Sequence, residues 1–146
     1  MSRRRAREKA LCVLFQVDVG QIPWQTALER AIAEEDMSVK ARDFLKRLVE
    51  GTLENLIRID ELISHAALDW TLERMAGTDR NILRFSVYEL LECSDIPVSV
   101  TVNEAVELAK VYGDDESGKF VNGVLGRIAR DTDPKKEAQD GKCPGL

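Results

Sequence analysis

One stretch near the middle of this chain reads Ile82-Leu83-Arg84-Phe85-Ser86-Val87-Tyr88-Glu89-Leu90-Leu91. On a helix, its apolar side chains cover most of the circumference instead of a single stripe. A helix that is apolar nearly all round is buried by neighbours on every side. The stretch therefore predicts a central helix, capped at Thr78 and ended by residues 94–97, around which an all-α protein packs.

The segments on both sides of this stretch carry apolar residues at helical spacing. We expect helices over residues 3–18, 24–35, 38–66 and 99–112, a last helix through 120–128, and a short amphipathic segment at 69–75. Within the long third helix, which Ser38 is expected to cap, Gly51 indicates either a bend or a close helix contact. The sequence thus predicts one domain over residues 1–132, a compact bundle of about seven helices, followed by a disordered tail over 133–146.

Composition excludes several classes of protein. No apolar run approaches the roughly 18 residues that span a bilayer, so no membrane partner is expected. The three cysteines are an odd number and lie far apart, which indicates a reducing cytoplasm and no disulfide framework. Cys12 and Cys93 fall beside apolar residues on expected helices and are interpreted as small core residues. With a single histidine and no C-x-x-C motif, neither a metal nor a cofactor is expected.

The N-terminus contrasts with the rest of an acidic chain, whose formal net charge is −5. Its first ten residues have a local charge of about +4, because one glutamate faces Arg3, Arg4, Arg5, Arg7 and Lys9. Such asymmetry is typical of proteins that bind an anionic partner, most often nucleic acid, although a merely solvated basic arm gives the same pattern.

The directions in which two of these arginines point on the helix limit the environments that their side chains are able to occupy. On a helical wheel, Arg3 and Arg7 continue the core-facing stripe that contains Leu14. Each of them must therefore pass the end of the protein body, pair with a carboxylate, or meet a phosphate.

Binding has more support in the sequence than catalysis has. The lone His65 has no obvious catalytic neighbour, and no glycine-rich loop follows a strand, so the chain is not expected to be an enzyme. Phe15, below the arginines, and Phe120, beside Lys119, are candidate platforms for unstacked bases, although core packing would also explain both. Asn122 is able either to read a base edge or to cap a neighbouring helix.

Three stretches together resemble the NusB family of transcription antitermination factors. They are residues 3–11; residues 82–90 followed by Asp95-Ile96-Pro97; and residues 102–110, which read V-N-E-A-V-E-L-A-K, followed by K-F-V-N-G-V-L at 119–125. The resemblance covers residues 3 to about 130. It implies two packed helical subdomains, binding of the boxA element of ribosomal-RNA leader transcripts, and a heterodimer with NusE. Through these contacts, other Nus factors and RNA polymerase would be indirect partners.

The resemblance also implies which residues contact RNA. Phe15 stands where some relatives have tyrosine, so a phenolic hydroxyl contact would be missing here. The full set carried over from the family is Arg3, Arg4, Arg5, Arg7, Phe15, Asp79, Arg80, Glu116, Lys119, Phe120 and Asn122, and Lys9 would add to the basic patch.

Other functions remain open at this point. The chain also resembles the helical RNA-binding domain fused to ribosomal-RNA methyltransferases, although no cofactor-binding βαβ segment follows it. A helical protein–protein adaptor whose basic arm serves only solubility is a second alternative. A helix-turn-helix that binds DNA is disfavoured, because the basic residues gather on the first helix. A homodimer through the partner-binding surface is left undecided.

Overall fold

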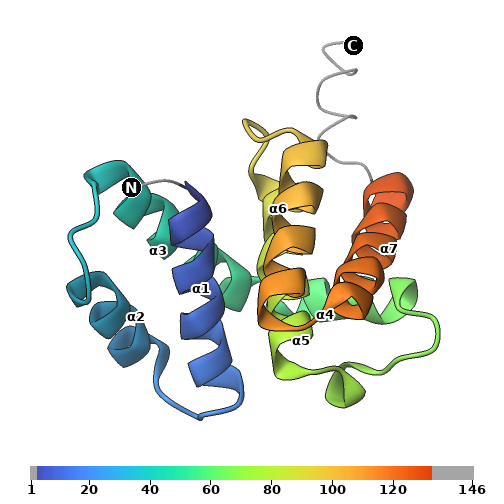
Figure 1. The fold of residues 1–146 in the computed structure, drawn as a ribbon, viewed down its shortest axis with the longest axis horizontal. Helices are drawn as coiled ribbons and strands as arrows, with labels where there is room; N and C mark the ends of the chain where they lie inside the picture. The colour runs from blue at the N-terminus through green and yellow to red at the C-terminus, as the bar shows by residue number, and fades with distance from the viewer. Residues whose placement is uncertain (1–2, 133–146) are drawn as a thin grey trace.

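The computed structural model describes residues 3–132 and builds them from helices joined by short connections (Figure 1). In chain order these are α1 (Arg3–Asp18), α2 (Trp24–Ala33), α3 (Val39–Glu54), α4 (Leu56–Ala66), the 3-10 turn η1 (Leu72–Arg74), α5 (Gly77–Glu92), α6 (Val98–Tyr112) and α7 (Asp115–Thr132). No strand occurs between residues 3 and 132, so the all-α prediction is confirmed. The tail predicted for residues 133–146 lies outside the described residues.

The helices form two packed groups, as predicted. Helices α1, α2 and α3 lie on one side of the molecule, and α4 to α7 lie on the other (Figure 1). Within the first group α1 packs against α2 and α3, while α6 packs against α7 and α5 in the second. Helix α5 contacts α1 and α3 as well, so it joins the two groups.

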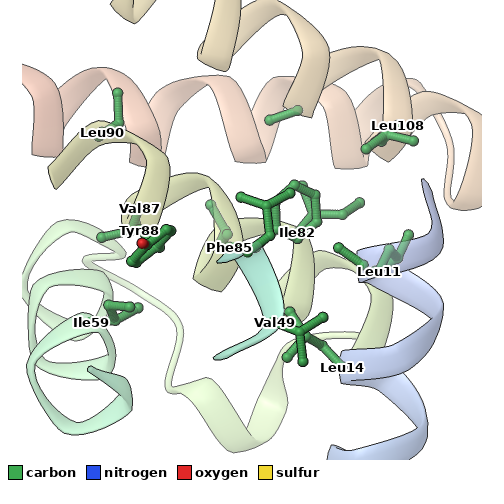
Figure 2. Close-up of a cluster of buried hydrophobic side chains, with 14 of the residues drawn as sticks. Leu11, Leu14, Val49, Ile59, Ile82, Phe85, Val87, Tyr88, Leu90 and Leu108 are labelled. Atoms are coloured by element: carbon green, nitrogen blue, oxygen red, sulfur yellow. The ribbon is translucent and has the colours of Figure 1, made fainter. Parts of the chain in front are cut away.

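Helix α5 is the centre of the core, in agreement with its apolar circumference. Ile82, Leu83, Phe85 and Val87 are completely buried. Figure 2 shows Ile82, Phe85 and Val87 among side chains from α1, α3, α4 and α6. Full burial of one such side chain stabilises a protein by about 1.5–3 kcal/mol, so this helix supplies a large part of the stability.

Gly51 marks a close helix contact, one of the two readings that the sequence allowed. A Cβ atom built on Gly51 would collide with the ring of Tyr88 on α5. The missing side chain thus lets an aromatic ring of the central helix lie directly against the backbone of α3.

The prediction of a single third helix over residues 38–66 is wrong. The chain leaves helical geometry at Asn55 (φ −108°, ψ 18°), which separates α3 from α4. The Asn55 side-chain amide donates a hydrogen bond of 2.8 Å to the Gly51 carbonyl, and asparagine often competes with the backbone in this way. The predicted cap at Ser38 is confirmed, because its hydroxyl accepts from the Ala41 backbone N–H at 3.1 Å.

Two further expectations about single residues are wrong. Thr78 does not cap α5, since the helix begins one residue earlier at Gly77 and the Arg80 N–H already bonds the Ala76 carbonyl. Cys12 is exposed on α1 instead of lying in the core, whereas Cys93 is buried. In neither case did local apolar spacing determine the outcome, because tertiary packing fixes both the start of α5 and the face of α1 that stays uncovered.

None of the helices between residues 3 and 132 is both long and apolar enough to cross a membrane.

Candidate nucleic-acid interface

Three arginines of the basic arm reach the surface at the N-terminal end of α1, and each is held by a carboxylate. Arg3 donates to Asp95 at 3.1 Å. Arg4 bonds Glu104 of α6 through two nitrogens, at 3.0 and 2.7 Å. Arg5 bonds Glu35, at 2.6 Å from Nη2, and Glu8. A guanidinium has five N–H donors, so a carboxylate on one edge of Arg4 leaves donors for a second anion.

Arg7 and Lys9 face inward from the same helix. Arg7 is 3% exposed and bonds Glu89 of α5 through Nε and Nη2, both at 2.8 Å. The Lys9 amine lies 2.9 Å from Glu34. Of the three fates that the sequence allowed for Arg7, pairing with a carboxylate is the one observed. Both residues therefore support the arm from below instead of presenting donors at the surface.

The other candidate residues gather at the opposite end of α1. Phe15 lies against Gly77 at the start of α5, since a Cβ on Gly77 would approach the Phe15 ring to 2.8 Å. Beyond it, a cavity of about 400 Å³ opens between the start of α5 and the start of α7. The residues lining it are Trp70, Arg74, Met75, Ala76, Asp79, Asp114, Glu116, Ser117 and Phe120. Its volume is within the range of small-ligand pockets.

Asp79 is one of the polar residues that line this cavity. One of its carboxylate oxygens accepts from the Ser117 hydroxyl at 3.3 Å. The other, Oδ1, is buried without a hydrogen-bond partner among the described residues. Burial raises the pKa of Asp79 above its ordinary value; the bond from Ser117 opposes this shift, and the charge of Asp114 adds to it. An acceptor that is buried and unsatisfied costs free energy until a donor reaches it.

Aromatic rings wall the same cavity. Phe120 and Trp70 meet edge to face, with their centroids 6.3 Å apart. Trp70 is half exposed, at 49%, and sequence reasoning did not single it out. The sequence does contain an indication of its role, because Trp70 is a large aromatic residue in the connection after α4 and does not belong to an apolar helical stripe.

The remaining candidates divide between structure and surface. Arg80 turns inward, where it pairs with Asp18 at 2.7 Å and bonds the carbonyls of Leu72 and Met75. On α7 the Glu116 and Lys119 side chains are exposed and lie 3.7 Å apart. Asn122, one turn further along α7, is also exposed. The structure thus brings Phe15, Asp79, Glu116 and Phe120 toward one end of α1, while Arg3, Arg4 and Arg5 lie at the other.

Helices α1 and α6 lie side by side (Figure 1), and the boundary between them, called the seam below, connects the two ends of α1. Arg3 and Phe15 are separated by about 18 Å, at 1.5 Å of rise per residue. Glu104 of α6 bonds Arg4 at the first end, and Asp114, just after α6, lines the cavity at the second. Between residues 3 and 132, no group of three His, Cys, Asp or Glu side chains is placed to hold a metal ion.

Comparison with known proteins gives a consistent result. A model described as the NusB family matches residues 4–130. The transcription antitermination protein NusB of Bacillus subtilis is 50% identical over 131 residues, which cover 90% of this chain and 97% of that protein. The one from Pelotomaculum thermopropionicum is 53% identical over 128 residues, or 88% of this chain and 89% of that protein.

Solved structures agree with the sequence relatives. A structure of T. maritima NusB, 42% identical, superposes with a TM-score of 0.88 and covers 95% of this chain and 98% of its own. A crystal structure of the antitermination factors NusB and NusE in complex with dsRNA contains a chain 29% identical, with a TM-score of 0.81 and coverage of 88% and 96%. This chain therefore belongs to the NusB family.

Proposed function

We propose that this chain is a transcription antitermination factor that binds the boxA element of ribosomal-RNA transcripts as a heterodimer with NusE. Family membership supports the antitermination role, and the related complex of NusB and NusE with RNA supports both partners. The pair would help to assemble other Nus factors on RNA polymerase. Its mechanism is assembly in the cytoplasm and involves no catalysis.

The observation that carries this proposal is the pairing of two unlike sites along α1. Exposed guanidiniums lie at one end, and a cavity walled by aromatic rings lies at the other, in a chain whose formal net charge is −5. Arginine forks suit phosphates, and sequence-specific RNA recognition takes up unstacked bases on aromatic side chains. A single strand that follows the seam between α1 and α6 would meet both.

Each candidate residue has a distinct task in this arrangement. Arg3, Arg4 and Arg5 contact phosphates, while the buried Arg7 and Lys9 and the partly buried Arg80 fix the helices that carry the site. A base enters the cavity against Phe120 and Trp70, and its exocyclic amino group donates to the unpartnered oxygen of Asp79. Phe15, Glu116, Lys119 and Asn122 flank this path.

The test is fluorescence anisotropy with a boxA RNA and a scrambled RNA, each with and without NusE, over a salt series. Binding should favour boxA, strengthen with NusE, and weaken several-fold in Arg4→Gln. The slope of log K against log salt should fall by about 0.7, the value for one lost phosphate contact on a single strand.

Arg30→Gln is the matched control, because it removes the same charge from an exposed position on α2. Arg7 is unsuitable for this experiment, since its substitution would break a buried ion pair and disturb the fold. Equal weak binding of both RNAs, with Arg4→Gln and Arg30→Gln indistinguishable, would favour the adaptor alternative.

A further inference from the structure

A second basic hollow lies on α3, outside the seam described above. It has a volume of about 490 Å³ and is lined by Arg3, Lys40, Ala41, Asp43, Phe44 and Arg47. Three of these side chains are cationic and one is acidic. Arg3 belongs to this α3 groove and also to the basic arm, so the two surfaces are continuous.

Helical spacing explains how the α3 groove forms. Lys40, Phe44 and Arg47 are four and then three residues apart, which puts them on one face of α3. The buried Phe44 ring is its floor, and the guanidinium carbon of Arg3 lies 4.9 Å from the ring centroid. Cation–π contact of this kind orients an arginine that would otherwise move freely in solvent.

Arg47 is also fixed in place. Its Nη2 donates a hydrogen bond of 3.1 Å to the carbonyl of Glu92, at the C-terminal end of α5. Because a carbonyl carries no charge, this bond orients the guanidinium without neutralising it. The α3 groove thus has two anchored guanidiniums, from Arg3 and Arg47, with the Lys40 ammonium in its lining.

An anionic group already lies between the two guanidiniums. Asp95 places one carboxylate oxygen 3.1 Å from Arg3 and the other 4.0 Å from Arg47. All three side chains are about half exposed, so an anion from outside has access to the same donors. Two oxygens on one charged centre are also what a phosphodiester presents, and arginine forks bind it in the same way.

We propose that the α3 groove binds the phosphodiester backbone of the RNA where the strand continues past the arm, so that the RNA turns around the N-terminal end of α1. The inference rests on the proposed function and adds a second segment to the RNA path. The occupant is a backbone and not a base, because Phe44 is buried and presents no exposed ring for stacking.

The test compares a short boxA RNA with two longer RNAs, one extended by oligouridine at the 5′ end and the other at the 3′ end. The wild-type chain should bind one extended RNA several-fold more tightly than the short one. Lys40→Gln/Arg47→Gln should remove that advantage and leave the affinity for the short RNA unchanged. For the extended RNA, the salt slope should fall by about 1.4, the value for two lost phosphate contacts.

The matched control is Lys46→Gln/Arg58→Gln, which removes two charges from exposed positions on α3 and α4 that do not line the groove. It should keep the length advantage. Asp95→Asn should act in the opposite direction and strengthen binding of the extended RNA, an effect that a damaged fold would not produce. In addition, 4-thiouridine placed in the extension should crosslink to the peptide that contains residues 40–47.

The outcomes separate the two proposals. If the short RNA binds and the extension adds nothing, or adds as much in the groove variant as in wild type, the α3 groove is not part of the RNA path. If a polyglutamate peptide of equal charge displaces the extension as well as oligouridine does, the groove is a site for acidic protein segments instead. Failure of the wild-type chain to bind either RNA would overturn the proposed function and this inference together.

Discussion

Arg7 of α1 and Glu89 of α5 form a two-point ion pair in the interior, with both hydrogen bonds at 2.8 Å. The Thr101 hydroxyl of α6 donates a further bond of 3.0 Å to Glu89. Three helices from the two halves of the molecule therefore meet at one carboxylate. This carboxylate also supports the helix from which Arg3, Arg4 and Arg5 project.

Removal of the Glu89 carboxylate should strongly destabilise the fold. Glu89→Ala leaves the buried Arg7 charge with only Glu104, at 3.7 Å, as a counter-ion, and we expect a loss of about 3–5 kcal/mol in the free energy of unfolding. In thermal melts this corresponds to a Tm lower by roughly 10 °C or more. The control is Glu107→Ala, which breaks an exposed pair with Lys110 and should cost less than about 0.5 kcal/mol. Similar losses in both variants would show that the buried pair has no special weight.

Two glycines should respond to alanine with opposite signs. In Gly51→Ala the new methyl group collides with the Tyr88 ring, and such overpacking costs about 1–3 kcal/mol. On α7, a Cβ at Gly123 meets nothing within 4 Å, so Gly123→Ala should gain roughly 0.5–1 kcal/mol from helix propensity. Urea denaturation of both variants would check this. A stabilising Gly51→Ala would mean that Tyr88 is not held against α3.

Asp79 should make stability depend on pH in an unusual direction. Burial raises its pKa, so between the unfolded and folded pKa values the native state holds more protons than the unfolded state does. The contribution of this group to stability therefore falls as pH rises through that window. Relative to Asp79→Asn, the wild-type chain should lose stability from about pH 4 upward, as urea midpoints would show. A constant difference would contradict the raised pKa.

The same variant should affect RNA recognition. Asp79→Asn changes the acceptor that faces the cavity, and we expect it to reduce discrimination between boxA and scrambled RNA by roughly fivefold or more. The salt slope should not change, because no phosphate contact is lost. A change in salt slope without a change in discrimination would place Asp79 beside the RNA backbone instead of a base.

Cys12 offers a direct probe of the RNA path, because it is exposed on α1 between the arm and Phe15. Partial burial raises the pKa of its thiol, although the charges of Lys9 and Arg5 oppose the shift. Alkylation should therefore be slow at pH 7 and accelerate as the pH rises above the ordinary thiol range. Saturating RNA should slow it, measured on the Cys12 peptide by mass spectrometry. Unchanged labelling with RNA bound would exclude the path along α1.

Hydrophobic periodicity allowed much of the fold to be predicted. The first helix was expected over residues 3–18 and is observed there, because its apolar stripe is continuous. The break at Asn55 was missed, since apolar spacing continues across it and only the side-chain bond to Gly51 interrupts the helix. Local competition of that kind is invisible to a pattern of apolar residues.

The basic arm could be identified from its residue types, but the exposure of its individual side chains could not be predicted. Lys9 and Arg7 belong to the basic run, yet both are buried. Their carboxylate partners lie 25 and 82 residues away along the chain, so the local sequence does not show this pairing. The signal was present for Arg7, since it occupies the core-facing stripe and Glu89 interrupts an otherwise apolar helix. A buried charge requires an opposite charge, so the two positions could have been paired.

The early start of α1, at Arg3, has a consequence for the kinetics of RNA association. Disordered basic arms must fold when they bind, which adds a conformational step to association. Here the arginines stand on a helix that exists in the free protein, so only an exchange of carboxylate for phosphate follows the collision. Binding should therefore proceed in a single phase whose rate is set by electrostatic attraction and falls with added salt.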